Sequence, residues 1–138
     1  YITESTGRYM NNWDHFENFS RDEFACQCGC GKADMKAEFM LQLQRLRTSC
    51  GFPFKISSGY RCSEHNNKVS SSGYAGPHTT GLAVDIGVAG EQARKLINKA
   101  SDFSGVGIKQ KGNHESRFIH LDNLETAAGR PRPWVWSY

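Results

Sequence analysis

The sequence predicts an α+β fold, a single domain in which helices pack on a small central antiparallel or mixed sheet. Its 138 residues suffice for one hydrophobic core but not for two. Two segments show the apolar periodicity of amphipathic helices, and four others are short and extended in character. Without an internal repeat or a Pro/Ser-rich linker, one domain is expected over 1–138, with 1–19 as an N-terminal extension and 20–138 as the core.

The helices are predicted from capping and periodicity. Ser20 and Glu23 form the Ser-x-x-Glu pattern of a capping box, which predicts a short helical turn after Ser20. In the segment 35–50, apolar side chains recur every three or four residues, so the main amphipathic helix is expected there. A shorter amphipathic helix is expected over 91–100.

Four segments between and after these helices are predicted to be strands: 54–58, 82–88, 106–108 and 117–121. This order of helices and strands is typical of an α+β domain.

Charge and hydropathy exclude several classes of function. The formal net charge is +3, and the basic residues are scattered instead of forming a stripe that could neutralise phosphates, so no nucleic-acid partner is expected. A weak positive excess is compatible with an anionic polymer such as a bacterial cell wall. No run of eighteen apolar residues occurs, so no membrane insertion is expected.

Three residues form a candidate zinc site. Thr79, Thr80 and Gly81 disfavour a helix, so we expect a loop that carries His78 and leads into a strand that presents Asp85. Later in the chain, alternation in the segment 118–122 places His120 on one face of a strand with its apolar neighbours on the other. Two imidazoles and one carboxylate leave a fourth position open for water, as a catalytic zinc site requires. The alternative is that each histidine is an ordinary surface or core residue.

Four ordered motifs carry a resemblance to a known family. They are Ser58-Gly59-Tyr60-Arg61-Cys62-Ser63-Glu64-His65-Asn66, the pattern His-x-x-Gly-x-Ala-x-Asp from His78, Gly105-Val106-Gly107, and Phe118-Ile119-His120-Leu121-Asp122. Together they resemble the zinc D-alanyl-D-alanine carboxypeptidase family, which includes bacterial enzymes and many phage-encoded cell-wall hydrolases. Its relatives in metal geometry include lysostaphin-type peptidases and the hedgehog signalling domain. The likeness spans about residues 19–134.

The resemblance implies one catalytic zinc ion in a surface groove, with His78, Asp85 and His120 as its ligands and Arg61 facing the substrate. Zinc held in this way lowers the pKa of its bound water and polarises the scissile carbonyl. One departure is visible, because the family usually has serine where Gly76 stands. That puts a supporting hydrogen bond in doubt more than the metal site itself.

The general base is harder to place. Many relatives keep an acidic residue three positions before the last histidine, but here that residue is Arg117, which cannot serve. We assign the base to Glu115, with His114 as the second candidate, because the residue five before the last histidine has a similar place in the family. The alternative is a polar hairpin loop that only faces solvent.

Arg61 offers a guanidinium group that can hold a carboxylate through two parallel hydrogen bonds. It would orient the C-terminal carboxylate of a D-Ala-D-Ala stem. A D-Ala-diaminopimelate cross-link also leaves a free carboxylate beside the scissile amide, so carboxypeptidase and endopeptidase action both remain open. The alternative for Arg61 is a surface salt bridge.

The five cysteines cannot all pair within one chain. Cys26, Cys28 and Cys30 suggest a second, structural metal with Cys50 or Cys62, but one-residue gaps strain a tetrahedral thiolate site, whose usual spacing is larger. The sequence therefore favours a disulfide or free thiols. Related sequences have similar cysteine-rich turns at this point, which favours a structural role over a redox role.

The function predicted from the sequence is a monomeric zinc peptidase that cuts the peptide stem or cross-link of bacterial peptidoglycan, with a phage endolysin as one setting. It would act at the bacterial cell wall, in the periplasm or outside the cell; a phage-encoded form would be made in the host cytoplasm or carried on the virion. The alternative is a catalytically weak or inactive zinc-containing module that binds the cell wall.

Overall fold

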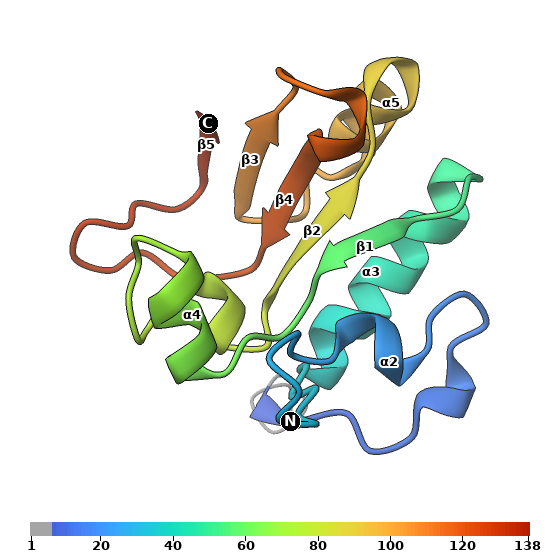
Figure 1. The fold of residues 1–138 in the computed structure, drawn as a ribbon. Coiled ribbons are helices and arrows are strands. Elements are labelled where there is room, and N and C mark those ends of the chain that lie inside the picture. Colours follow the sequence, from blue (N-terminus) through green and yellow to red (C-terminus); the bar gives the residue numbers. More distant parts are fainter. Residues whose placement is uncertain (1–6) are drawn as a thin grey trace.

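Five strands form one mixed sheet at the centre of the molecule, in the order β1-β2-β4-β3-β5 (Figure 1). The computed structural model of the chain describes residues 7–138, so residues 1–6 of the predicted extension lie outside the described residues. The strands are β1 Lys55–Ser58, β2 Ala83–Gly87, β3 Gly105–Lys109, β4 Phe118–Asp122 and β5 Trp134–Ser137. Only the β3–β5 pair is parallel among the described strands. The predicted α+β class is confirmed.

The described α-helices are α2 Arg21–Phe24, α3 Ala37–Cys50, α4 Ser63–Val69 and α5 Gly90–Lys99. Three short 3-10 turns accompany them: η1 Trp13–His15, η2 Pro77–Thr79 and η3 His114–Ser116. The predicted capping box is present, since the Ser20 backbone N–H donates to Glu23 Oε2 at 2.7 Å. Among residues 7–138, no helix is long and apolar enough to cross a bilayer.

Two elements were not predicted, α4 and β5. The sequence of α4 lacks an apolar stripe, and its one buried residue is the polar Asn66. Strand β5 is exposed at three of its four residues, so no burial pattern marks it. Both elements are held by contacts with distant parts of the chain, which a local periodicity cannot reveal.

One face of the sheet packs against α3 and α5 and forms the core (Figure 1). Val84 and Ile86 of β2 and Ile119 and Leu121 of β4 are fully buried on this side. Because side chains alternate along a strand, the residues between them point to the opposite face. That face carries the candidate site.

Part of the predicted N-terminal extension packs against this core. Phe19 belongs to the core, and Met10, Trp13 and Phe16 are partly buried against it. The Phe24 ring of the core contacts this segment, because its centroid lies 5.4 Å from that of Trp13 and 5.5 Å from that of Phe19.

Candidate metal centre

The three predicted ligands meet on the face of the sheet opposite the core. Asp85 and His120 are direct partners in the β2–β4 register, and η2 brings His78 over them from the adjoining loop. His120 Nδ1 lies 2.9 Å and His78 Nε2 lies 3.3 Å from Asp85 Oδ1. Their ligand atoms all lie within 4.8 Å of one another, and all three residues are buried. This is the loop-then-strand arrangement that the sequence predicts.

The outer nitrogen of each imidazole already has a partner. His78 Nδ1 lies 2.8 Å from the carbonyl oxygen of Gly59, and His120 Nε2 lies 2.7 Å from Asp122 Oδ2. With an N–H on each outer nitrogen donating to these oxygens, His78 Nε2 and His120 Nδ1 would carry the lone pairs that bind a metal beside Asp85. Metal-ligating histidines in proteins are oriented in the same way. The donor set therefore fits a zinc ion.

Asp122 connects His120 to Arg132. It is fully buried, and the guanidinium of Arg132 donates from Nε to Oδ1 at 3.0 Å and from Nη2 to Oδ2 at 2.8 Å. Burial raises the pKa of Asp122, but the hydrogen bonds from His120 and Arg132 outweigh it and hold the pKa well below its ordinary value. Asp122 therefore stays charged and fixes the orientation of the His120 ring.

The electrostatics of the inner pair follow from the same contacts. Burial raises the pKa of Asp85, yet hydrogen bonds from His120 and His78 more than compensate, so the net shift is downward. Burial lowers the pKa of His120, but the hydrogen bonds to Asp122 and Asp85 raise it above its ordinary value.

Two glycines of β3 make room for this arrangement. A Cβ on Gly105 would overlap Asp122 Oδ1 and come within 2.6 Å of Arg132 Nε. A Cβ on Gly107 would come within 2.7 Å of the Trp136 ring, whose centroid lies 5.3 Å from that of His120. The two glycines of the motif Gly105-Val106-Gly107 therefore leave space for the side chains that surround the metal centre.

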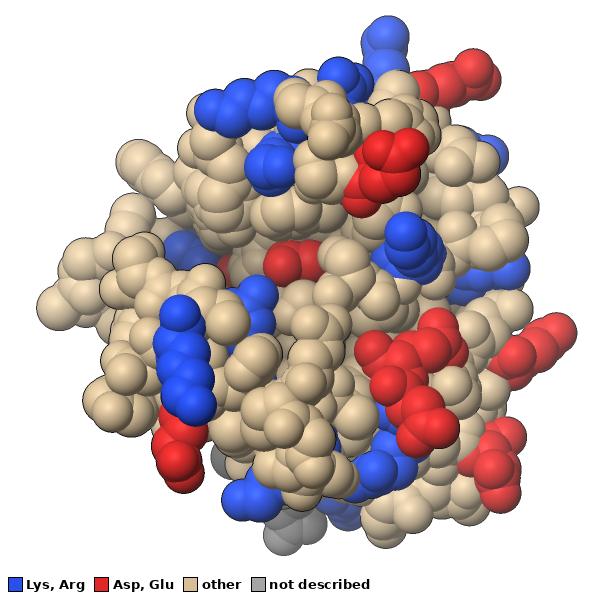
Figure 2. Space-filling model, viewed as in Figure 1, with Lys and Arg blue, Asp and Glu red and all other residues tan. Residues whose placement is uncertain are grey.

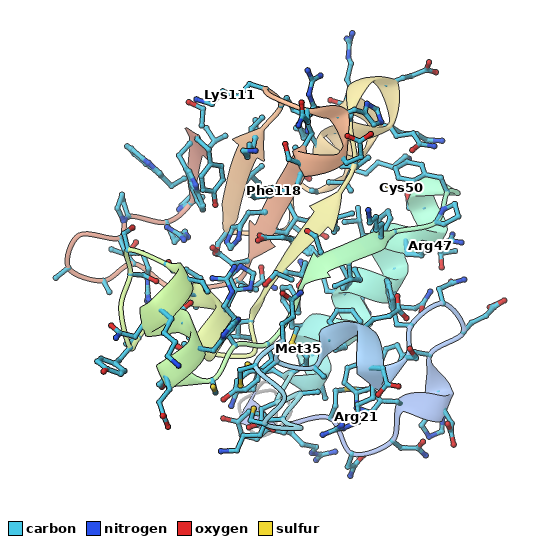
Figure 3. The ribbon with its side chains drawn as sticks, viewed as in Figure 1. Arg21, Met35, Arg47, Cys50, Lys111 and Phe118 are labelled. Carbon is cyan, nitrogen blue, oxygen red and sulfur yellow. The ribbon has the colours of Figure 1, made fainter. Side chains whose placement is uncertain are left out.

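A pocket opens over the candidate ligands. Figure 2 shows a hollow near the middle of this face, with acidic atoms on its floor and basic side chains around it. Figure 3 shows Phe118 at the start of β4, whose side chain lies on the rim. The residues that line the pocket are Arg61, Val69, Ser70, Ser72, Pro77, His78, Asp85, Phe118, His120, Trp136 and Tyr138.

Arg61 reaches the pocket beside the candidate ligands. Its Nη2 lies 3.8 Å from Asp85 Oδ2, while Nε donates to Ser58 Oγ at 3.2 Å and Nη1 to Asn66 Oδ1 at 3.0 Å. Asn66 is fully buried and donates in turn to Ser72 Oγ and to the carbonyl of Gly73. One amide side chain therefore fixes both Arg61 and the Ser/Gly-rich loop.

Ser72 occupies the space beside Gly76. A Cβ on Gly76 would overlap Ser72 Oγ and come within 2.8 Å of Asn66 Nδ2. The Ser72 hydroxyl thus fills the space that a side chain at position 76 would need. It accepts a hydrogen bond from Asn66 Nδ2 at 2.9 Å.

Glu115 and His114 are not among the residues that line this pocket. They lie in η3, before β4 begins, and line a separate hollow with residues such as Lys55, Glu91 and Arg117. Their assignment as general base stays a prediction, and the structure does not bring them to the candidate ligands.

Several site residues were assigned no role from the sequence. The alternation that identified His120 also placed Asp122 on its face, but nothing in the spacing pointed to Arg132 as its partner. Trp136 and Tyr138 line the pocket from β5 and the residue after it, and their period of two is the one signal that was available.

The family model of peptidase M15 matches residues 17–122. The chain belongs to the peptidase M15 family. This is the zinc D-alanyl-D-alanine carboxypeptidase family, so the family membership predicted from the motifs is confirmed. The matched region of this M15 metallopeptidase contains all three candidate ligands and Arg61, whereas Arg132 and β5 follow it. No curated protein matches the chain.

Proposed function

We propose that this M15 peptidase hydrolyses a D-Ala-containing bond in the peptide stem or cross-link of bacterial peptidoglycan. The observation that carries the proposal is the position of Arg61, whose guanidinium lies 3.8 Å from Asp85 in the pocket of the candidate metal centre. A carboxylate bound by Arg61 would place the neighbouring amide over the metal position. Both a terminal D-Ala and a D-Ala-diaminopimelate cross-link offer such a carboxylate.

Arg61 is well prepared for this role. Ser58 and Asn66 hold two of its nitrogens, and the fixed guanidinium loses little freedom when a carboxylate binds. Its side chain is 19% exposed, so it can still meet a ligand.

A zinc ion bound by the candidate ligands would supply Lewis-acid polarisation of the scissile carbonyl and activation of water. Asp122 keeps His120 in the ligating tautomer. Trp136 and Tyr138 line one side of the pocket. Burial raises the pKa of Tyr138 above its ordinary value, and the charge of Asp85 adds to this, so the phenol keeps its proton and can donate a hydrogen bond to the substrate.

We keep Glu115 as the proposed general base, with His114 second. The decisive comparison is E115Q with H114A, each measured for kcat and for bound zinc. Removing a base should lower kcat by about 100- to 10,000-fold while zinc content stays constant. Normal kcat in E115Q and H114A would remove both residues from the mechanism.

The alternative function is a zinc-containing module that binds the cell wall without cutting it. One observation favours it: Asp85 is the one carboxylate among the described residues that line the pocket, and it is a candidate metal ligand. In that case E115Q would leave the affinity for peptidoglycan unchanged, and no new termini would form.

The experiment that tests the proposed function is digestion of purified peptidoglycan by metal-stripped and zinc-restored protein, with the products identified by mass spectrometry. Loss of terminal D-Ala establishes a carboxypeptidase, and cleaved cross-links or stems establish an endopeptidase. R61A should lose most of this activity, and R45A, on the exposed surface of α3, serves as the matched control. Failure to cleave several wall types would refute the enzymatic proposal and favour the binding module.

We further propose that the protein acts as a monomer at the bacterial cell wall, with a phage endolysin as its setting. The test is addition of zinc-loaded protein to bacteria whose outer barrier has been permeabilised. Loss of turbidity with wild type but not with H120A supports this setting, and intact cells with both contradict it.

A further inference from the structure

Four cysteine sulfurs gather at a second place in the molecule, which we call the sulfur cluster: Cys26, Cys28, Cys30 and Cys62. The Sγ of Cys26 lies 3.4 Å from that of Cys28 and 3.7 Å from that of Cys62, and the last two are 3.6 Å apart. All four sulfurs lie within 4.8 Å of one another. The fifth cysteine, Cys50, sits at the C-terminal end of α3, away from α4 (Figure 3).

These distances are those of a metal site and not of a disulfide. Bonded sulfurs are about 2.05 Å apart. Four thiolates around zinc, with Zn–S bonds of about 2.3 Å, have their sulfurs about 3.8 Å apart at the corners of a tetrahedron. All five cysteines of the chain are thiols in the structure. Of the two arrangements favoured from the sequence, a disulfide is therefore not present.

The turn that carries three of the sulfurs overcomes the strain expected from one-residue gaps. Gly29 and Gly31 have φ of +88° and +81°, a left-handed conformation that glycine adopts without steric cost. The backbone N–H of Cys26 donates to the carbonyl of Lys32 at 2.7 Å and closes the turn. The alternating glycines thus turn Cys26, Cys28 and Cys30 toward one point.

Backbone N–H groups point at the sulfurs. The N–H of Cys62 donates to Cys26 Sγ at 3.3 Å, and the N–H of His65 donates to Cys62 Sγ at 3.4 Å. Hydrogen bonds from the backbone stabilise a thiolate more than a thiol. They are expected around thiolates that bind a metal.

We propose that the sulfur cluster binds a second zinc ion through four thiolates. Zinc binding releases the four thiol protons to solvent, and no oxidant or reductant takes part. Because the protein fills all four positions, the site is closed and has no place for water or substrate. Soft thiolate ligands in a tetrahedral set select zinc over magnesium or calcium.

This zinc ion would hold the segment that carries Arg61. Cys62 follows Arg61 directly, the N–H of Arg61 donates to the carbonyl of His78 at 3.0 Å, and the N–H of Tyr60 donates to the carbonyl of Phe24 at 2.9 Å. A Cβ on Gly59 would come within 2.7 Å of the backbone of Phe24, so the two segments are in direct contact. The second zinc would therefore connect the turn after α2 to the loop that presents Arg61 to the pocket.

The first test counts metal in purified, zinc-loaded protein by mass spectrometry. Two zinc ions per chain are expected for wild type and one each for C28S and H120A, which lose different ions. C50A is the matched control, because it removes a cysteine outside the cluster, and it should keep two. A wild type with one zinc ion, together with an unchanged zinc content in C28S, would overturn the proposal.

The second test does not depend on a variant. Cys28 and Cys30 are exposed, so an alkylating reagent used above neutral pH can reach both thiols when no metal holds them. Protection of four thiols that a chelator abolishes supports the site, as does sulfur-to-cobalt charge-transfer absorption after cobalt loading that is lost in C30S. Rapid alkylation before chelation, or a disulfide within the cluster, contradicts it. Neither outcome depends on peptidase activity, so failure here is separable from failure of the proposed function.

Discussion

His120 is held from both sides, by Asp85 through Nδ1 and by Asp122 through Nε2. A ring fixed in this way presents its inner nitrogen to a metal without losing rotational freedom on binding. The inner contact determines where the ion sits, and the outer contact determines which tautomer meets it. The two contacts should therefore fail in different ways when they are altered.

The substitution D122N tests the outer contact. An amide oxygen is a weaker acceptor than a carboxylate, and Arg132 would lose its charged partner. We expect zinc affinity at the candidate centre to fall about 10- to 100-fold, measured by competition with a chelator. D102N, on an exposed loop, is the control and should bind as wild type does. Equal affinity in D122N and wild type would mean that Asp122 serves only to hold Arg132.

The raised pKa of His120 predicts how zinc binding depends on pH. Zinc requires an unprotonated Nδ1, so a pKa above the ordinary value lets protons compete at higher pH than they would for a free histidine. Affinity should be constant above the raised pKa and fall as pH drops through it. D122N weakens the hydrogen bond that does most to raise this pKa. In D122N, the loss of zinc affinity should therefore begin at a lower pH than in wild type. Comparing the two proteins across pH cancels the contribution of the sulfur cluster, and identical onsets would contradict the assignment.

Gly76 and Ser72 form a pair whose roles can be exchanged. A Cβ at position 76 would overlap Ser72 Oγ, so G76S should destabilise the protein by about 1–3 kcal/mol in denaturant unfolding. S72A removes the obstructing hydroxyl, and the double variant G76S/S72A should recover most of the loss because the hydroxyl introduced at position 76 can then accept from Asn66. Additive effects in this cycle would show that the two positions are independent.

At the scale of the element, β3 contributes to the site because its glycines have no side chains. Gly107 lies opposite His120 in one neighbouring strand and opposite Trp136 in the other. A methyl group there has no space unless the Trp136 ring moves, and that ring is a wall of the pocket. Strand β3 therefore separates β4, which carries His120, from β5, which carries Trp136.

The substitution G107A should lower kcat/KM by roughly 10- to 100-fold, because a displaced wall alters how the substrate lies over the metal centre. The matched control is G87A in β2, where a Cβ meets Lys55 at an ordinary 3.4 Å. Activity and intrinsic tryptophan fluorescence should change together in G107A and remain unchanged in G87A. A change in both variants would indicate a general loss of strand stability instead.

The elements that periodicity predicted are those that bury an apolar stripe. The helix expected over 35–50 forms as α3 Ala37–Cys50, and the strand expected over 117–121 forms as β4 Phe118–Asp122. The segments that were missed, α4 and β5, are polar or exposed and depend on partners far along the chain. The same limit applies to the site. Asp85 and His120 belong to sequence motifs that can be recognised, whereas the Asp122–Arg132 contact and the position of Ser72 beside Gly76 arise only when the chain has folded.

Across the whole molecule, Arg61 lies on a short loop between two groups of metal-binding side chains. On one side, η2 and the sheet hold the candidate catalytic ligands; on the other, the sulfur cluster joins the turn 26–30 to Cys62 across 36 residues. The first group stands on strands that are already paired in the sheet. The second stands on a turn whose residues 27–32 are all exposed. Besides the proposed zinc ion it is held by hydrogen bonds such as those from Arg21 to the carbonyl of Gly31 and from Gln27 to the carbonyl of Ser57.

This asymmetry predicts where the protein loosens when the second zinc is lost. In C28S, backbone amides of residues 24–32 and 60–65 should exchange with deuterium at least about tenfold faster than in the C50A control, because they open locally. Amides of β2 and β4 should keep their protection, since their hydrogen bonds and the core beneath them do not involve the cluster. Faster exchange across the entire chain would mean instead that the cluster supports global stability, and unchanged exchange would mean that no ion holds it.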